Sequence, residues 1–463
     1  MAKKTLLRGV AALALVGCGI GAWSVGALAA DAGDLGTVQA TTPGGTGAAS
    51  SGTAAKIDTA PYQAPSQTPL DVTQPTSIVS QHFIENSVVQ VGNYDDAIKF
   101  TPSFSNVEPN GPGLQESKFI NMRGFQDGQY NLTYDGIPLA GSPTSFHHES
   151  GVYFMEHDLG GVQIDRGPGM ASTLGNATFG GTINLLSKDP LANLSAGPYA
   201  TAGSFNTSLF GAEADTGAIK TMNGASFIVD AERLNSDGFL TDSSSQRTNA
   251  YGKGIIPIGT DTVISFVGMV NHTDQHVPSG ATMQELSQNG YNFGMNNNPG
   301  SNNYQGYNFS TYATDLEYVG VQHNFDDGWV LDNKIYTDYF AHISVSSANN
   351  ADLPADFTTL THGSYNVGGT VLATSLTNQI LGSLGQQEYR AWGDMLRVSK
   401  DVSFGQVRAG LWLDRTDNSY SKENVDLSDG SLPEYKTSSL SGPWSSRPSA
   451  ALSSFCSETF AFL

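Results

Sequence analysis

Positive charge is scarce in this sequence. Lysine and arginine together number 22 of 463 residues, against 43 aspartates and glutamates, which gives a formal net charge of -21 at pH 7. A nucleic-acid-binding protein needs a basic surface to displace the counterions of the phosphate backbone. The charge balance therefore argues against nucleic acid as a partner.

Cysteine is scarcer still, with two residues, Cys18 and Cys456. The first lies in an N-terminal segment that we expect to be removed, so the mature protein cannot form an internal disulfide. Its stability must come from side-chain packing and backbone pairing. A run of about 18 apolar residues is also missing after that segment, so no helix is expected to span a bilayer.

The N-terminal segment has the features of a secretory signal peptide at residues 1–29. Three basic residues precede an apolar stretch, which ends in Ala27-Leu28-Ala29, a cleavage site of the A-x-A type. A retained anchor is disfavoured because glycines interrupt the stretch, and a lipoprotein signal at Cys18 because apolar sequence continues beyond it. An exported chain without membrane helices is periplasmic, secreted or an outer-membrane barrel.

Composition divides the mature chain further. Residues 30–69 are a flexible linker rich in Gly, Ala, Ser, Thr and Pro, with a short extended stretch, DLGTVQAT, near its start. Residues 70–189 predict a small α+β unit of short, glycine-bounded strands. One of its helices is expected to begin near Asp95 and Asp96 and to end before Pro102.

Apolar and polar residues alternate with period two beyond residue 190. The pattern predicts eight strands in four hairpins: 199–212/224–235, 248–257/261–272, 311–325/328–341 and 388–401/405–416. Alternation alone fits a soluble sandwich as well as a barrel. Short turns within three of the hairpins and long polar connections at 273–310 and 342–387 favour an outer-membrane barrel.

Four glycine-containing motifs follow one another in the α+β unit. They are NMRGF at 121–125, YDGIPL at 134–139, VQIDRGPG at 162–169 and STLGNATFGGTINLLSK at 172–188. Gly175, Gly180 and Gly181 predict close approach of the backbone to neighbouring strands. A phosphate-binding loop is disfavoured because the G-K-[ST] ending is missing.

In this order and spacing the motifs resemble the plug domain of TonB-dependent outer-membrane receptors. The resemblance implies a mainly β fold, in which a small α+β plug domain (70–189) precedes antiparallel transmembrane β-barrel strands (190–435), the N-terminal part of an incomplete barrel. It also implies energised uptake of a scarce ligand across the Gram-negative outer membrane, with iron–siderophore complexes as the commonest substrate class. A non-transporting receptor or sensor, or an inactive truncated fragment, is the alternative.

The resemblance implies partners as well. DLGTVQAT is similar to the TonB box, although a disordered N-terminus would have the same composition. We expect TonB, coupled to ExbB and ExbD, to bind Leu35, Gly36, Thr37, Val38, Gln39 and Ala40. The other expected partners are outer-membrane lipid and a small extracellular ligand such as a siderophore, and the protein is expected to be a monomer without a cofactor.

Two arginines of the plug region are expected to contact the barrel. Arg123 and Arg166 lie in otherwise uncharged strands. We expect them to pair with acids that face the lumen, and exposure to solvent is the alternative. The candidate acids are Asp230, Glu232 and Glu317.

Polar residues in two stretches of the plug region are candidates for ligand binding. They are Asp127, Gln129 and Tyr130 in the first, and His147 and His148 in the second. Glu149, Glu156 and His157 follow the second stretch, and these residue types suit a transition metal. The spacing matches no standard motif, so no metal site is predicted. An enzyme is not expected, because the glycine-rich segments lack the G-x-S-x-G pattern of a nucleophile elbow.

The C-terminal part departs from the family pattern. Plugged transporters have about 22 strands, and residues 190–463 have room for far fewer at the predicted spacing. Residues 436–463 are serine-rich, do not alternate, and end in Leu463 rather than an aromatic residue. We expect this tail to come from a frameshift or a premature stop, with a naturally short variant as the alternative.

Overall fold

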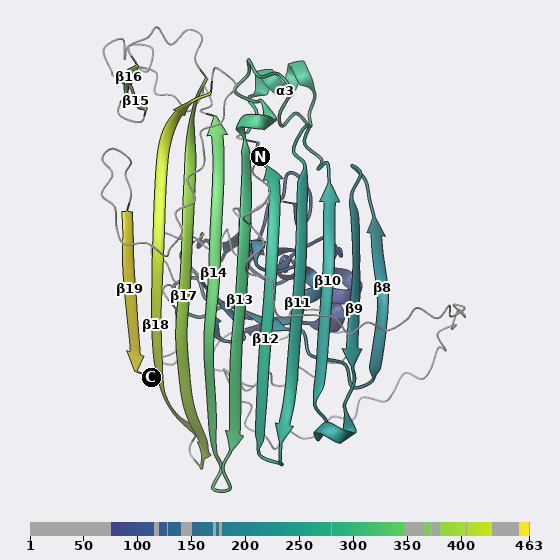
Figure 1. Ribbon diagram of the computed structural model, residues 1–463, viewed down its shortest axis with the longest axis vertical. Coiled ribbons are helices and arrows are strands. Elements are labelled where there is room, and N and C mark those ends of the chain that lie inside the picture. Colours follow the sequence, from purple (N-terminus) through teal and green to yellow (C-terminus); the bar gives the residue numbers. More distant parts are fainter. Residues whose placement is uncertain are drawn as a thin grey trace, which may run out of the picture. The chain divides into compact units, whose positions relative to one another are not determined.

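Two sheets dominate the computed structural model of the protein (Figure 1). The structure describes residues 76–114, 120–126, 128–139, 151–169, 173–175, 178–278, 280–347, 365–367, 370–372, 380–403, 405–427 and 453–462. All of them belong to one compact unit. The predicted signal peptide, linker and TonB box lie outside the described residues.

The smaller sheet has five strands and forms the centre of the plug domain. Its order is β1-β6-β7-β4-β5. β6 is antiparallel to both of its neighbours, whereas β4 runs parallel to β7. The strands are β1 (Thr76–Ser80), β4 (Asn131–Tyr134), β5 (Ile137–Pro138), β6 (Leu159–Asp165) and β7 (Thr182–Ser187). β2 (Phe104–Ser105) and β3 (Asn121–Met122) pair separately.

The helices of the plug domain are short and capped. α1 (Gln81–Ser87) begins after Ser80, whose side chain accepts a hydrogen bond from the backbone of Phe83. α2 (Tyr94–Ile98) follows Asn93, which forms a capping box with Asp96. The predicted helix with two aspartates in its first turn is therefore confirmed. A 3-10 turn, η2 (Glu156–Asp158), leads into β6.

The larger sheet is antiparallel and has ten strands in the described part of the chain. Its order is β19-β18-β17-β14-β13-β12-β11-β10-β9-β8, and its edge strands do not pair with each other there, so the sheet is open. The expectation of an incomplete barrel is confirmed. The strands are β8 (Leu194–Ala202), β9 (Ser208–Thr216), β10 (Ser226–Ser236), β11 (Ser245–Ile258), β12 (Thr262–His276), β13 (Phe309–Asn324), β14 (Trp329–Ser347), β17 (Leu381–Val402), β18 (Gly405–Asp426) and β19 (Ser453–Phe462).

Connections differ between the two ends of this sheet, as expected. The short turns at 259–261 and 325–328 lie at its lower end in Figure 1, and the described residues between β12 and β13, which include α3, lie at its upper end. The upper connections contain α3 (Met283–Asn289), η4 (Gln305–Tyr307), β15 (Tyr365–Val367) and β16 (Thr370–Leu372), and a lower one contains η3 (Lys220–Met222). None of the described helices is long and apolar enough to cross a membrane.

The predicted strand 199–212 is wrong. The chain turns back at residues 203–207, where Phe205 and Asn206 adopt left-handed backbone angles with φ of 59° and 53°. β8 and β9 pair across this turn, from Leu194↔Thr216 to Ala202↔Ser208. Asn tolerates the left-handed conformation, so one tight turn replaces what looked like continuous alternation.

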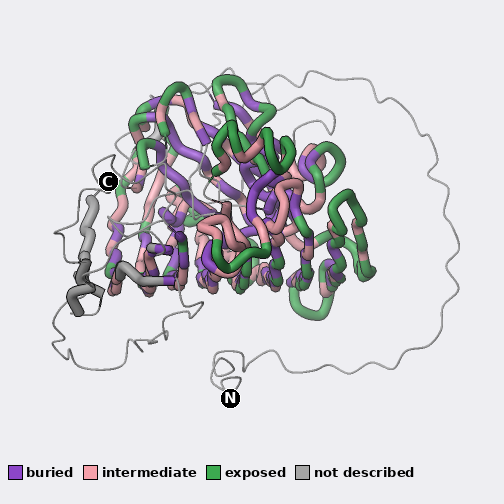
Figure 2. Tube along the Cα trace, turned by 90° about the horizontal axis from the view of Figure 1, so that it is seen from above, coloured by how far each residue is buried: buried purple, intermediate pink, exposed green. Residues whose placement is uncertain are grey.

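A single hydrophobic core joins the plug domain to the larger sheet. It contains Ile84, Leu132 and Tyr134 of the plug domain together with Leu316 and Phe340 of the sheet. In Figure 2 buried segments occupy the middle of the molecule, and exposed segments lie mainly in turns and loops. The plug domain therefore packs against one face of the sheet, which we call the inner face.

Candidate functional site

The contact between the plug domain and the inner face is the candidate functional site. Its lowest part is a tight turn between β4 and β5, where Asp135 and Gly136 have φ of 49° and 80°. Two consecutive positive φ angles are typical of a type I′ hairpin turn, which Asp-Gly favours. The turn directs Asp135 toward the larger sheet.

Asp135 accepts three hydrogen bonds, one from the plug domain and two from the larger sheet. Its carboxylate accepts from the Tyr318 hydroxyl at 2.7 Å and from the Ser187 backbone at 3.0 Å. Its carbonyl oxygen accepts from Lys334 at 2.9 Å. Burial alone raises the pKa of the carboxyl, but the charges of Lys253 and Lys334 outweigh burial and lower the pKa below its ordinary value. We call this contact the Asp135 anchor.

β11 holds the segment that follows β7. Tyr251 donates to the carbonyl oxygen of Lys188 at 2.7 Å. Lys253 donates to the Ser187 hydroxyl at 2.5 Å and forms an ion pair with Asp189 at 2.5 Å. The strand predicted from GGTINLLSK thus ends in a run of contacts with the larger sheet.

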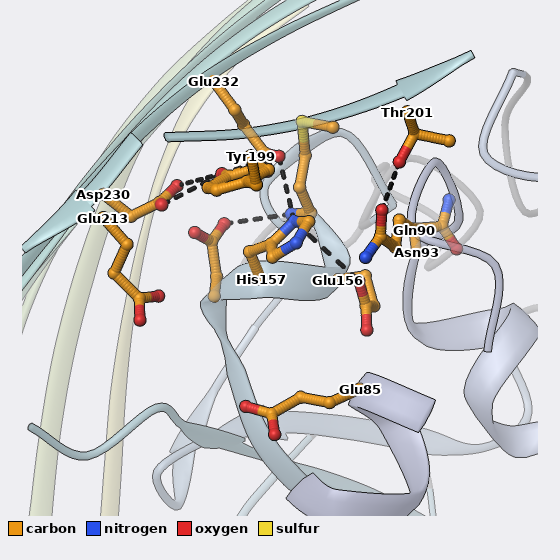
Figure 3. A network of polar contacts seen from close by, with 12 residues as sticks. Glu85, Gln90, Asn93, Glu156, His157, Tyr199, Thr201, Glu213, Asp230 and Glu232 are labelled. Carbon is orange, nitrogen blue, oxygen red and sulfur yellow. Dashed lines mark hydrogen bonds and ion pairs between the residues drawn. The ribbon is translucent and has the colours of Figure 1, made fainter. Parts of the chain in front are cut away.

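A second group of polar residues joins η2 to β8 and β10 (Figure 3). His157 lies 3.0 Å from Glu232 and 3.8 Å from Glu156, measured from Nδ1 to a carboxylate oxygen. Its ring stacks on Tyr199, with centroids 4.3 Å apart. We call the following six residues the His157 cluster: Glu156, His157, Asp158, Tyr199, Asp230 and Glu232.

Tyr199 links the two acids of β10. Its hydroxyl lies 2.9 Å from both carboxylate oxygens of Asp230 and 3.1 Å from Glu232. Asp158 accepts from Asn249 of β11 at 2.8 Å and from the Met155 backbone at 2.9 Å. The cluster therefore joins η2 to β8, β10 and β11 of the larger sheet.

Burial and charge shift the pKa of each titratable plug residue in the cluster. Burial alone lowers the pKa of His157, but the hydrogen bond and charge of Glu232 outweigh it and raise the pKa to about 9. Burial is the main cause that raises the pKa of Glu156 to about 7 and of Asp158 to about 8, and the charge of Glu232 adds to it. At neutral pH His157 is therefore a cation.

Lys188 extends the polar contacts to β9 and α1. Its ammonium group lies 2.7 Å from Glu213 and 3.5 Å from Glu85. Burial lowers the pKa of Lys188, but the hydrogen bond and charge of Glu213 outweigh it, so the pKa is raised. The side chain stays charged and ties a plug helix to the sheet.

Arg247 of β11 holds the chain before η2. It is 4% exposed and donates to the carbonyl oxygens of Gly151, at 2.6 Å, and Phe154. Its other contact is Asn271 at 3.1 Å. Nearby, the hydroxyls of Tyr153 and Tyr389 lie 2.7 Å apart. Backbone carbonyls of the plug domain are thus satisfied by the larger sheet.

Asn110 connects the plug domain to an upper loop. Its side chain donates to the Ser243 carbonyl at 2.7 Å and accepts from the Leu240 backbone at 3.0 Å. Its own carbonyl accepts from the Phe239 backbone at 3.0 Å. The loop between β10 and β11 therefore adopts its shape on the plug domain.

Three nearby carboxylates form a further acidic group in the described part of the chain: Asp95, Asp96 and Glu108. Lys99 lies 2.5 Å from Asp96, and Asn106 donates to Asp95 at 2.8 Å. Burial, and then the charges of Asp95 and Asp96, raise the pKa of Glu108 to about 9. Protein partners therefore contact two of the three carboxylates of this group.

The two plug arginines named from the sequence lie close together. Arg123 is exposed and donates to the carbonyl oxygen of Arg166. Of the lumen acids proposed as their partners, Glu232 contacts His157, and Asp230 contacts Tyr199. Pairing of the arginines with these acids stays a prediction.

The candidate ligand-binding residues are spread over different environments. Gln129 is exposed, whereas Tyr130, the other candidate for ligand binding in the described part of this stretch, is fully buried in the plug core. Its apolar ring fills space next to β4 instead. Asp127, His147, His148 and the TonB-binding residues 35–40 lie outside the described residues.

Sequence reasoning missed the roles of Asp135, Arg247 and His157. The Asp-Gly pair was a visible turn signal for Asp135. Arg247 is a charged residue on the face of β11 that alternates inward, which was a weaker signal. His157 was noted for metal chemistry, and its pairing with Glu232 depends on how one domain docks on another, which no local pattern encodes.

Comparison with protein families identifies one domain. Residues 68–182 match the model of the TonB-dependent Receptor Plug Domain. None of the curated proteins compared with the chain matches it.

Solved structures with the same fold include three transport proteins. The pyoverdine outer membrane receptor FpvA from Pseudomonas aeruginosa, bound to pyoverdine, has a TM-score of 0.56 and 15% identity over 84% of this chain and 55% of that chain. The ferric citrate transporter FecA in the unliganded form has a TM-score of 0.57 and 14% identity, over 81% and 51%. The copper transporter OprC has a TM-score of 0.52 and 12% identity, over 78% and 48%. The chain spans about half the length of these structures.

Proposed function

Because residues 68–182 are a TonB-dependent receptor plug domain and the remaining described strands have the sheet of that fold, we propose that the chain belongs to an outer-membrane receptor for TonB-dependent uptake. The proposal concerns the whole receptor, of which the chain spans about half in the solved structures. Three features support it: the polarity of the sheet, the outer loops and the plug contacts.

Reversed polarity of the larger sheet carries the proposal. Asp230 and Glu232 on the inner face are each 3% exposed, whereas Val229, which directly precedes Asp230 in β10 and faces the other way, is 44% exposed. Val319 and Ile335 on the outer face are 54% and 61% exposed. A soluble sheet buries its apolar face, and an outer-membrane barrel turns that face to lipid. The outer face therefore suits a bilayer.

The upper connections suit recognition of a polar ligand. Residues 277–308 form a structured loop in which many hydrogen bonds come from asparagines, such as Asn303 to Glu285 at 2.6 Å. The loop also contacts the β10–β11 loop, where Thr241 donates to the Met295 carbonyl at 2.8 Å. Asn110 carries this connection to the plug domain. A ligand bound at the upper loops would therefore influence the plug.

An iron–siderophore complex is the proposed ligand. FpvA is bound to pyoverdine, and PiuA from Acinetobacter baumannii, a further structure with the same fold, is described as a siderophore receptor. Citrate-bound iron and copper are transported by other proteins of this fold. Siderophore complexes are polar and too large for passive entry, which suits long polar loops above a plugged sheet.

TonB is the proposed energy-coupling partner, together with ExbB and ExbD. The sequence of residues 35–40 is similar to a TonB box and precedes a segment rich in Gly, Ala, Ser, Thr and Pro. Such a segment can pair with an exposed sheet edge as an added strand. Pulling on it would act on β1, because the linker leads directly into this edge strand of the plug sheet.

Iron uptake by the host cell tests the proposal. Cells that lack the gene, complemented with the wild-type gene or with a deletion of residues 35–40, are given radiolabelled iron bound to a panel of siderophores. Wild-type complementation is expected to restore accumulation, and the deletion is expected to abolish it. Deletion of six residues within 48–53 of the linker is the matched control. Accumulation that is independent of residues 35–40, or restored for labelled cobalamin or copper instead, contradicts the proposal.

A further inference from the structure

His157 occupies the centre of a contact made by separate elements. It lies between Glu156 of η2 and Glu232 of β10, at 3.8 and 3.0 Å, and its ring stacks on Tyr199 of β8. The His157 side chain is 12% exposed. One plug side chain thus connects two strands of the larger sheet (Figure 3).

Negative charge exceeds positive charge around this ring. The acids that act on the His157 charge are Glu232 and Asp230 from β10 and Glu156 from η2. Around them, Lys188 after β7 acts on Glu156 and is itself paired with Glu213 of β9 and Glu85 of α1, and Arg247 of β11 acts on Asp158 of η2 and on Glu232. Tyr199 of β8 faces the ring as well. The charge of His157 therefore offsets the charges of the acids directly beside it.

The polar atoms at the centre of the cluster are buried. Nδ1 of His157 and one oxygen each of Glu156, Asp158 and Glu232 have no hydrogen bond of good geometry among the described residues, so His157 meets Glu232 and Glu156 through charge, at 3.0 and 3.8 Å. A buried charge is tolerated when it is paired, and removal of its partner is costly. Loss of the imidazolium charge would take from Glu156 and Glu232 the ion-pair partner that they share.

We propose that His157, held as an imidazolium between Glu156 and Glu232, is the latch that fastens the plug domain to β8 and β10, and that loss of its proton releases this side of the plug. The latch does not require a ligand or TonB. If an experiment disproves the latch, the proposed uptake function therefore still stands. If the uptake function is disproved, the latch still stands.

The direction of the pH dependence follows from the shifted groups. The pKa of His157 is raised to about 9 in the folded protein from an ordinary value of 6.5. Its stabilising contribution is therefore complete below about pH 6.5 and disappears as the pH rises through about 9. Glu156 and Asp158, whose pKa values are raised to about 7 and 8, ionise over the same range and add negative charge. All three groups weaken the contact as the pH rises.

Hydrogen exchange of the purified full chain in detergent tests the latch. Exchange rates of the amides in η2 and β6 are measured from pH 6 to 10 and corrected for the intrinsic pH dependence of exchange. In the wild type, protection is expected to fall between about pH 6.5 and 9, where the contribution of His157 is lost, and to change little above pH 9. In H157Q, protection is expected to be about tenfold lower already at pH 7, because the amide carries no charge. In H157K, which restores a cation with a higher pKa, protection at pH 7 is expected to return and to persist beyond pH 9.

His323 supplies the matched control. Its Nδ1 lies 2.8 Å from the Thr262 hydroxyl, within the larger sheet. The two residues form the terminal pair of β12 and β13, and neither belongs to the His157 cluster. H323Q is expected to keep wild-type protection of η2 and β6 at every pH. The latch would be overturned if H157Q were protected as strongly as the wild type. It would also be overturned if EDTA lowered the protection of the wild type at pH 7, because a metal ion would then be the link.

NMR of the histidine rings tests the latch without any substitution in the plug domain. With carbon-13 in the histidine rings, one ring is expected to titrate near pH 9, and in E232Q this titration is expected to move toward the ordinary range. Titration of every ring near pH 6.5 would overturn the proposal.

Discussion

At the scale of single residues, two charged groups fix the plug domain in opposite ways. Asp135 is an anion beside Lys253 and Lys334, so its contribution is lost in acid. His157 is a cation among acids, so its contribution is lost in alkali. The two contacts use different strands, β13 and β14 in one case and β8 and β10 in the other. The plug is therefore held on both sides only over an intermediate pH range.

The Asp135 anchor leads to a prediction for Asp135→Asn. The amide keeps the shape but not the charge that Lys253 and Lys334 stabilise, and charge-assisted hydrogen bonds contribute about 2 kcal/mol. We expect the free energy of unfolding of the plug domain to fall by about that amount. Because the folded pKa is lowered, the deficit should be constant at neutral pH and should shrink below about pH 4.

Denaturant titrations of the full chain at several pH values measure this deficit. Asp327→Asn, in an exposed turn where the aspartate side chain is 64% exposed, is the control and is expected to change little. An equal deficit in both variants, or a deficit that grows toward low pH, would refute the anchor.

At the scale of elements, glycines allow the plug strands to come close. A Cβ on Gly181, which has φ of +128°, would lie 2.2 Å from the carbonyl oxygen of Asp165. A Cβ on Gly175 would lie 1.9 Å from the side chain of Asn131. The dense glycines of the sequence therefore serve close packing of β6, β7 and β4, as the sequence predicted.

Gly181→Ala is expected to destabilise the plug domain by about 3 kcal/mol, from the positive φ and the contact with backbone that cannot move aside. Gly197→Ala, in β8, is the control, because a Cβ there meets nothing within 4 Å. It is expected to change the free energy of unfolding by less than about 0.5 kcal/mol. Protection of β6 and β7 from hydrogen exchange distinguishes the two variants, and equal protection would contradict the packing argument.

Elements with local signals were predictable and those without were not. β6 and β7 overlap the glycine-containing motifs at 162–169 and 172–188, because glycines bound their apolar runs. α3 was missed, although Thr282 and Glu285 form a capping box that the sequence displays. The turn at 203–207 also contains turn-forming residues, Gly203, Ser204 and Asn206, but alternation on both sides of them concealed it. The pairing of His157 with Glu232 joins residues that are 75 positions apart, so it required the docked domains.

At the scale of the whole molecule, the inner face of the larger sheet buries charged residues among its apolar ones, and the outer face exposes large apolar residues. Phe266, Val319 and Ile335 are directly adjacent across β12, β13 and β14, and all three are exposed. On the inner face the plug domain covers charged residues such as Asp230 and Glu232. The plug thus supplies the polar partners that the inner face needs, and the outer face is left for lipid.

This arrangement makes Val319→Arg diagnostic of the environment of the outer face. In a bilayer, an arginine at mid-depth on a barrel surface costs about 2–4 kcal/mol. In water, the same change at an exposed position costs less than about 0.5 kcal/mol. Thr260→Arg, in the turn between β11 and β12, is the control, because that position lies at the lower rim. Unfolding free energies of the full chain in lipid vesicles compare the two variants. We expect a loss of about 2–4 kcal/mol for Val319→Arg alone, and equal, small effects at both positions would mean that the outer face meets water.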